Sequence, residues 1–275
     1  CVISSCTVTA EADRQTRQAV RRALRQNPLA HVVVTGCYAQ NQAQVCADIP
    51  GVSLVLGNDH KHTVAKFVLA LKKPDSQKKV PIKVDRLTSL PSGLLNGFDS
   101  RSRAFVQVQQ GCDQSCTFCV IHRARGPSRS FNEAHILRQI DTFVDSGFRE
   151  VVMCGVDLGS YAADRAGEYS ALPLTSLLGK IVDLSGSFRV RLSSIDPIHL
   201  TDDLLDALSE SDRFCPYLHV SMQSGSTLIL KRMKRRYDRE FLLDRLFAAR
   251  ERIDGLVLGA DVMAGFPTES AQDHA

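Results

Sequence analysis

The sequence predicts an α/β protein with a small parallel α/β domain at its N-terminus, followed by a partial (β/α) barrel of the TIM type. Short β-branched runs alternate with amphipathic stretches, the alternation stops at a polar segment rich in Gly and Pro, and longer strand–helix units then follow. These three observations predict an N-terminal domain at 1–75, a linker at 76–99 and a second domain at 100–275. Both domains are expected to be truncated, because the chain starts at Cys1 within an apolar run and stops where a further helix should begin.

Strands and helices alternate regularly in the predicted N-terminal domain. Residues 2–5 have the pattern of a strand end, and residues 10–28 form an amphipathic helix that a proline terminates. Residues 31–40 contain a short strand of β-branched residues, and residues 52–73 repeat the order of strand, turn and helix. This order predicts a small parallel sheet.

Five further strands are predicted in the second domain, at residues 104–110, 150–155, 188–194, 217–223 and 255–265. Amphipathic helices are predicted between them, at residues 133–146, 174–184, 202–209 and 239–252. Serial βα units predict a parallel barrel, whose active site forms at the carboxyl ends of the strands. The residues at these ends include Cys112, Gly155, Asp157, Ser193 and Gln223.

The composition predicts a cytoplasmic protein with metal-binding cysteines. No apolar run approaches the eighteen or so residues of a membrane span, and charged residues near the N-terminus exclude a signal peptide. Nine cysteines in such a chain are more typical of metal ligands than of disulfides. The net charge of +4 is compatible with a nucleic-acid partner without requiring one.

The stretch "QGCDQSCTFCVIHRARGPSRS" at 110–130 brings together Cys112, Cys116 and Cys119. Four thiolates would saturate a structural zinc ion or an electron-transfer cluster. Three would leave one iron of a [4Fe–4S] cluster open to a small chelating molecule. The alternative is a zinc site with His122 as fourth ligand, although zinc ribbons usually present two C-x2-C pairs.

This C-x3-C-x2-C pattern after a first barrel strand resembles the radical S-adenosylmethionine (SAM) superfamily. The resemblance implies that the three thiolates hold a [4Fe–4S] cluster, that its open iron chelates SAM, and that reductive cleavage releases a 5′-deoxyadenosyl radical. It also implies that Phe118 lies beside the adenine. From their places at strand ends we predict that Gly155, Asp157, Ser193 and Gln223 contact SAM, with a turn or packing role as the alternative for each.

The stretches "SSCTVTAEADRQTRQAVRRA", "VVVTGCYAQ", "RARGPSRS", "LKRMKRRY" and "GFPTES" are similar to the methylthiotransferases, a branch of this superfamily. In that family, three cysteines of the N-terminal domain hold a second [4Fe–4S] cluster tied to sulfur delivery. Cys6 and Cys37 match two of them, and the third would precede Cys1. The family usually has Asn where this chain has Ser4 or Ser5. The other cysteines are expected to be buried packing residues: Cys1, Cys46, Cys154 and Cys215.

The resemblance is to the bacterial branch that modifies tRNA at C2 of N6-threonylcarbamoyladenosine next to the anticodon. It implies hydrogen abstraction from C2 and transfer of a methylated sulfur to that carbon. The implied partners are a tRNA anticodon stem-loop, a flavodoxin-like electron donor of unknown identity and an unknown sulfur donor. Asp157 favours this branch, since the branch acting on N6-isopentenyladenosine commonly has Asn there. That branch and one acting on a ribosomal-protein aspartate remain alternatives.

A basic segment, "LKRMKRRYDR", follows the fourth barrel strand. Its cations and Tyr237 are suited to phosphate contact and base stacking, and a solvated helix face is the equally weighted alternative. The predicted RNA-contacting residues are Lys231, Arg232, Lys234, Arg235 and Arg236. A second positive stripe, on the helix at 14–25, has the same two interpretations.

Three rival functions remain open. A non-enzymatic Fe–S scaffold or electron-transfer protein predicts clusters whose spectra do not respond to SAM. A radical SAM enzyme without sulfur insertion predicts one cluster per full-length chain. A zinc-binding RNA module predicts zinc and no iron.

Overall fold

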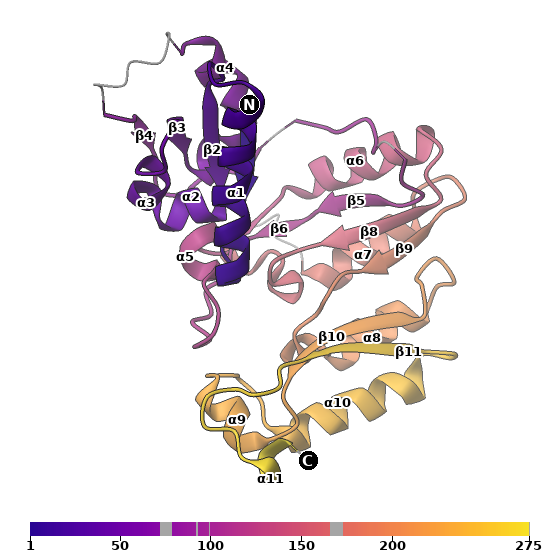
Figure 1. Ribbon diagram of the computed structural model, residues 1–275. Coiled ribbons are helices and arrows are strands. Elements are labelled where there is room, and N and C mark those ends of the chain that lie inside the picture. The colour runs from indigo at the N-terminus through magenta and orange to yellow at the C-terminus, as the bar shows by residue number, and fades with distance from the viewer. Residues whose placement is uncertain (72–78, 92, 99, 166–172, 275) are drawn as a thin grey trace. The chain divides into compact units, whose positions relative to one another are not determined.

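The computed structural model describes residues 1–71, 79–91, 93–98, 100–165 and 173–274 (Figure 1). Its contacts divide the chain into two compact units. The first unit consists of residues 1–91, 111–114 and 119–127, and the second of residues 92–110, 115–118 and 128–275. Residues 111–114 and 119–127 of the cysteine loop thus belong to the first unit, and residues 115–118 belong to the second.

The first unit is built on a parallel sheet of strands β1 (Val2–Ser5), β2 (Val32–Gly36), β3 (Val52–Leu56) and β4 (Ile82–Lys83), in that order. All five residues of β2 are buried, as expected of the central strand of a sheet covered on both faces. Alternate residues face opposite sides. Val32 and Val34 accordingly join one core cluster and Val33 joins another.

Helices cover both faces of this sheet. Helix α1 (Ala10–Gln26) begins at Thr9, whose hydroxyl accepts a hydrogen bond from the Ala12 amide at 3.1 Å, and its Val20 enters the first cluster. Tyr38 of α2 (Cys37–Asn41) enters the same cluster, and Phe67 of α4 (Val64–Leu69) packs on the second cluster. The remaining helices of the unit are α2 (Cys37–Asn41), α3 (Ala43–Ala47), η1 (Asn58–Thr63), α4 (Val64–Leu69) and α5 (Ile121–Arg125).

The second unit contains parallel strands in the serial order of a barrel. Strands β5 (Ala104–Gln107), β8 (Glu150–Cys154) and β9 (Arg189–Leu192) form one sheet, and β10 (Tyr217–Gln223) pairs with β11 (Val257–Val262). Bridges such as Ile195–Val220 connect the β9 and β10 segments. The helices are α6 (Glu133–Asp145), α7 (Leu174–Val182), α8 (Asp202–Ser209), α9 (Thr227–Arg232), α10 (Arg239–Arg252) and α11 (Ala271–His274) (Figure 1). Short 3-10 turns complete the unit: η2 (Leu158–Ser160), η3 (Ala163–Arg165) and η4 (Pro197–His199).

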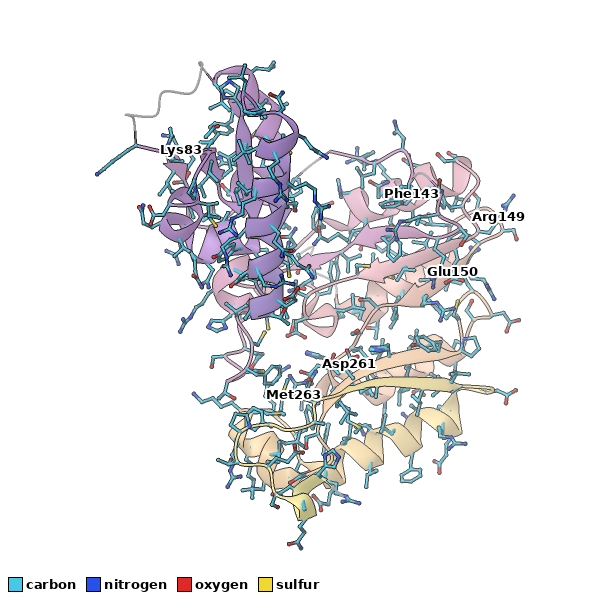
Figure 2. The ribbon with its side chains drawn as sticks, viewed as in Figure 1. Lys83, Phe143, Arg149, Glu150, Asp261 and Met263 are labelled. Carbon is cyan, nitrogen blue, oxygen red and sulfur yellow. The ribbon has the colours of Figure 1, made fainter. Side chains whose placement is uncertain are left out.

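Figure 2 labels residues at the two ends of the barrel strands. Arg149 and Glu150 lie at the amino end of β8, and Asp261 and Met263 lie near the carboxyl end of β11 (Figure 2). Glu150 accepts hydrogen bonds from Arg191 Nε at 2.8 Å and from Arg189 Nη2 at 3.2 Å. Burial opposes its charged form, but the hydrogen bond and charge of Arg191 prevail and lower the pKa of the Glu150 carboxyl. The amino rim is therefore held by internal ion pairs.

The predicted fold class is confirmed. The short strand predicted within residues 31–40 is confirmed as β2, which ends at Gly36, where a positive φ of 101° turns the chain into α2. Residues 82–83 of the predicted linker form β4 and pair with β3, whereas residues 76–78, 92 and 99 lie outside the described residues. No helix in the described part of the chain is long and apolar enough to cross a bilayer.

Candidate functional site

The cysteine loop is framed by an antiparallel ribbon, which the sequence did not predict. Strand β6 (Gln109–Gln110) pairs with β7 (Arg129–Ser130), so the loop leaves and rejoins the second unit at one point. Gly111 then takes a φ of +76°, and a Cβ there would collide with the backbone of Pro127. The Cys112 amide donates to the Gly126 carbonyl at 3.1 Å. A glycine at 111 is therefore required for the two arms of the loop to approach.

Each cysteine of the loop accepts an N–H donor at its sulfur. The Gln114 amide lies 3.4 Å from Cys112 Sγ, and the Ile121 amide lies 3.4 Å from Cys119 Sγ. Both are backbone donors two residues after the cysteine. Hydrogen bonds to ligand sulfurs stabilise thiolates and tune iron–sulfur clusters. The local backbone of both arms therefore suits thiolate ligands.

The middle cysteine, Cys116, is supported by a side chain instead. In the second unit, Arg235 Nη1 lies 3.5 Å from Cys116 Sγ. The Arg235 side chain is only 8% exposed and pairs with Asp196 at 2.8 Å. The prediction that Arg235 contacts RNA is therefore wrong, because a buried guanidinium with internal acceptors cannot reach a phosphate.

The rest of the basic segment divides in the same way. The side chains of Lys231, Arg232 and Lys234 are exposed, and Arg236 is partly exposed beside Asp157. Tyr237 is buried and donates its hydroxyl to the Met222 carbonyl at 2.9 Å, so its predicted role in base stacking is wrong. In the first unit, Arg21 and Arg25 on α1 are exposed.

The two cysteines predicted in the N-terminal domain follow adjacent strand ends. Ser5 of β1 lies opposite Gly36 of β2, so Cys6 and Cys37 continue from neighbouring positions. The Ser5 hydroxyl donates to the Thr35 carbonyl at 2.6 Å, which ties the two ends together. Cys6 is exposed and Cys37 is buried.

Cys37 has donors that the sequence analysis did not identify. Arg125 Nε, from α5, lies 3.1 Å from Cys37 Sγ, and Asn58 Nδ2 lies 3.9 Å from it. Asn58 also donates to the Ala124 carbonyl at 2.8 Å, which anchors α5 beside Cys37. A sequence signal existed for Asn58, because it follows the end of β3 as Cys37 follows the end of β2. No such signal existed for Arg125, which is 88 residues from Cys37 in sequence.

Three other cysteines behave as packing residues, whereas Cys1 is exposed and its predicted burial is wrong. Burial raises the pKa of the Cys46 thiol to about 12 and that of Cys154 to about 11. The Cys215 thiol also has a raised pKa, again chiefly through burial. Such thiols stay protonated at neutral pH and are poor ligands. These cysteines therefore differ chemically from those with N–H donors at sulfur.

Gly155, Ser193 and Gln223, three of the predicted SAM contacts, lie at or next to strand ends of the second unit, and Phe118 lies in the cysteine loop. The Ser193 hydroxyl is buried and has no hydrogen-bond partner among the described residues. Gln223, the last residue of β10, has a φ of +64°, and Phe118 is 36% exposed. A Cβ at Gly155 would lie 2.8 Å from Leu158 Cα, so the close backbone approach is to η2. An unpartnered buried hydroxyl suits a ligand contact.

Asp157 is held by the protein's own side chains. Its carboxylate is 3.1 Å from His199 Nε2 and 3.9 Å from Arg236 Nη2, and it accepts from Ser160 Oγ at 2.8 Å. Burial favours the neutral acid, but the hydrogen bonds from His199 and Ser160 outweigh it and lower the pKa of Asp157. Gln109, also missed from the sequence, accepts from the Asp157 amide at 2.9 Å.

No group of three or more His, Cys, Asp or Glu side chains in the described residues has a geometry that could hold a metal ion. The predicted ligand sets therefore stay predictions. The donor chemistry around Cys37, Cys112, Cys116 and Cys119 fits thiolate ligands of an iron–sulfur cluster.

Two family profiles match different parts of the chain. The profile of the Radical SAM superfamily matches residues 106–275, and that of the Uncharacterized protein family UPF0004 matches residues 1–57. The chain is 36% identical, over 99% of its length, to the threonylcarbamoyladenosine tRNA methylthiotransferase MtaB of Bacillus subtilis, of which it covers 60%. The protein of the same name from Rickettsia prowazekii is 38% identical over 98% of the chain, which covers 62% of it.

A relative with a different name is also similar. The tRNA-2-methylthio-N(6)-dimethylallyladenosine synthase of Clostridium botulinum is 31% identical over 90% of the chain, which covers 54% of that protein. The chain thus spans less than two thirds of the length of these relatives.

Solved structures show the same fold at low identity. The radical SAM methyltransferase TsrM of Kitasatospora setae has a TM-score of 0.68 at 15% identity, covering 98% of this chain and 57% of its own. The cobalamin-dependent SAM radical enzyme OxsB has a TM-score of 0.64 at 16% identity, covering 99% of this chain and 41% of its own. The superfamily profile includes the cysteine loop and the barrel strands. The chain belongs to the radical SAM superfamily.

Proposed function

We propose that this chain carries the catalytic core of a tRNA-modifying enzyme. Its reaction is transfer of a methylthio group to C2 of N6-threonylcarbamoyladenosine next to the anticodon. The observation that supports this most directly is the similarity to threonylcarbamoyladenosine tRNA methylthiotransferases over nearly the whole chain, from the N-terminal cysteines through the cysteine loop. The contrast between donor-supported and inert cysteines agrees with it.

In this proposal, Cys112, Cys116 and Cys119 hold a [4Fe–4S] cluster whose fourth iron is open to SAM. When bound, the cluster and SAM supply the 5′-deoxyadenosyl radical that breaks the unreactive C2–H bond. The chain's own residues orient the ligands: Gly111 allows the arms of the loop to approach, and the N–H donors stabilise the thiolates.

The proposed SAM contacts are Phe118, Gly155, Ser193 and Gln223. The strongest support comes from Ser193, whose buried hydroxyl has no partner among the described residues. For Asp157 we propose a packing role in place of direct SAM contact, because its carboxylate pairs with His199 and Arg236.

We assign the second [4Fe–4S] cluster to Cys6 and Cys37 of the first unit, together with a further ligand outside residues 1–275. Arg125 and Asn58 place N–H groups toward the Cys37 sulfur. A sulfur species carried at this site would be anionic, and the guanidinium charge of Arg125 would stabilise it.

The proposed partner is a tRNA anticodon stem-loop, with an unidentified flavodoxin-like electron donor and an unknown sulfur donor, in the cytoplasm. The exposed cations Lys231, Arg232, Lys234 and Arg236 are candidates for phosphate contact.

Nucleoside mass spectrometry of tRNA tests this proposal. Cells that lack the full-length gene should lose the 2-methylthio group from threonylcarbamoyladenosine alone, and the wild-type gene should restore it. A Cys116→Ala gene should not restore it, whereas a Cys215→Ala gene, altered at an inert thiol, should do so. Loss from isopentenyladenosine instead would move the enzyme to that branch, and unchanged tRNA would overturn the proposal.

The rival of another class is an Fe–S scaffold without catalysis, and spectroscopy separates the two. If the cluster's electron paramagnetic resonance (EPR) spectrum does not change when SAM is added to anaerobic protein, all irons are protein-ligated and the scaffold is supported.

A further inference from the structure

The segment that follows α9 binds the middle of the cysteine loop through backbone groups. The Thr117 amide donates to the Met233 carbonyl at 3.2 Å, and the Thr117 hydroxyl donates to the Arg232 carbonyl at 3.1 Å. Carbonyls in the last turn of a helix have no partner within the helix, and Thr117 supplies donors to them. The loop residue after Cys116 is thus held by the end of a helix more than 100 residues away in sequence.

The helix end also explains why one cation of the basic segment is buried. The Lys234 amide donates to the Lys231 carbonyl at 3.0 Å, and the Arg235 amide donates to the Leu230 carbonyl at 2.9 Å. With Lys234 at a φ of +58°, these bonds form a Schellman motif. The motif reverses the chain, so Lys234 remains exposed while Arg235 points inward.

Arg235 is then fixed by acceptors on all sides. Its Nη1 lies 3.5 Å from Cys116 Sγ, and its Nη2 lies 2.8 Å from Asp196 and 3.1 Å from the Ser221 carbonyl. Its Nε donates to the Tyr237 hydroxyl at 3.1 Å. Arginine keeps its charge when buried, and here the charge of Asp196 raises its pKa against the effect of burial. A permanent positive charge therefore lies against one thiol of the loop.

A cation that donates to a ligand sulfur favours the more negative, reduced form of an iron–sulfur cluster, and second-shell donors also orient their ligand. We propose that Arg235 is a positioning residue of the radical SAM cluster, which holds the Cys116 thiolate and raises the cluster's reduction potential. Its part of the basic segment thus serves the cluster, while the exposed Lys234 does not. The inference rests on the proposed function, because it concerns the cluster assigned there to Cys112, Cys116 and Cys119.

The test is a redox titration of the anaerobically reconstituted chain, followed by EPR of the reduced cluster and by iron analysis. The variants are Arg235→Gln, the double variant Arg235→Gln/Asp196→Asn, and Lys234→Gln as a matched control. Lys234→Gln removes one charge from the neighbouring residue, which is exposed. The double variant removes the whole buried pair, so no unpaired carboxylate is left to destabilise the fold.

Arg235→Gln should shift the one-electron redox equilibrium about tenfold toward the oxidised cluster, a midpoint about 59 mV more negative. The double variant should shift it in the same direction, with an altered EPR signal, and Lys234→Gln should match the wild type. A cluster with an unchanged midpoint in whichever Arg235 variant folds would overturn the inference and leave the proposed function standing. An equal shift in Lys234→Gln would also overturn it. Wild-type protein that binds no [4Fe–4S] cluster would overturn the proposed function itself.

Discussion

Replacing Gly111 with alanine tests whether the close approach of the two loop arms is needed to hold a cluster. Gly111 and Gly147 both have a positive φ, of 76° and 93°. They differ in their surroundings, because a Cβ at 111 would collide with the Pro127 carbonyl and lie 2.7 Å from the Gly126 oxygen, whereas a Cβ at 147 meets nothing within 4 Å. Gly147→Ala is therefore a matched control for backbone strain alone.

The expected magnitudes follow from these contacts. A left-handed conformation costs an alanine about 1–2 kcal/mol, and that should be the whole effect of Gly147→Ala. At Gly111 the arm must also move, which adds about 1–3 kcal/mol of overpacking strain and about 1 kcal/mol for the lost Cys112–Gly126 hydrogen bond. We therefore expect Gly111→Ala to lower the free energy of unfolding by roughly 3–6 kcal/mol where the strain remains in the folded chain. If the loop relaxes instead, stability recovers and the cluster site is lost.

Urea unfolding of the purified chain measures the first quantity, and iron bound per chain after anaerobic reconstitution measures the second. Gly147→Ala should bind as much iron as the wild type, and Gly111→Ala should bind clearly less. If Gly111→Ala is no less stable than Gly147→Ala and binds its full complement of iron, the arms do not need to meet, and the reasoning is refuted.

Three further predictions concern residues other than Gly111. Glu150→Gln should lower the free energy of unfolding by roughly 1.5–3 kcal/mol at pH 7, because it weakens the charge-assisted hydrogen bond that the nearly buried Glu150 carboxylate accepts from the partly exposed Arg191. Folding lowers the pKa of Glu150, so the stabilisation from its carboxylate is complete above the ordinary carboxyl pKa and is lost as the pH falls through the folded pKa. Urea unfolding at pH 7 and at pH 3 should therefore show that the free energies of unfolding of Glu150→Gln and wild type differ less in acid. Arg125→Gln in the full-length protein should weaken iron binding at the N-terminal site by roughly 10-fold or more. Arg123→Gln, on the exposed side of the same helix, should bind as much iron as the wild type. Equal iron content in the two variants would contradict the role of Arg125. Asp157→Asn should destabilise the chain by roughly 1–3 kcal/mol, because it weakens the bonds of this carboxylate to His199 and Ser160. SAM affinity measured by calorimetry should be nearly unchanged. A large loss of SAM affinity at constant stability would instead show that Asp157 contacts SAM directly.

The backbone donors of the cysteine loop follow from the local sequence. Cys112 and Cys119 each lie two residues before the amide that bonds to their sulfur, so the predicted ligand and its donor belong to one short segment. The strand-end positions of Cys6, Cys37, Ser193 and Gln223 follow in the same way from alternation along the chain.

The errors arose where burial decides the role of a side chain. Arg235 and Lys234 are adjacent and chemically alike in sequence, and both were predicted to contact RNA. A Schellman turn with a single left-handed residue leaves one in solvent and buries the other against Cys116.

By itself, the sequence determined which thiols are available and which strands carry them, because side-chain period and the spacing of cysteines are properties of neighbouring residues. Only the tertiary structure decided which cations support those thiols. Arg125 reaches Cys37 across 88 residues, and Arg235 reaches Cys116 across 119. Such pairs are set by packing between distant segments and by the cost of burying an unpaired charge, and neither leaves a periodic trace in the chain.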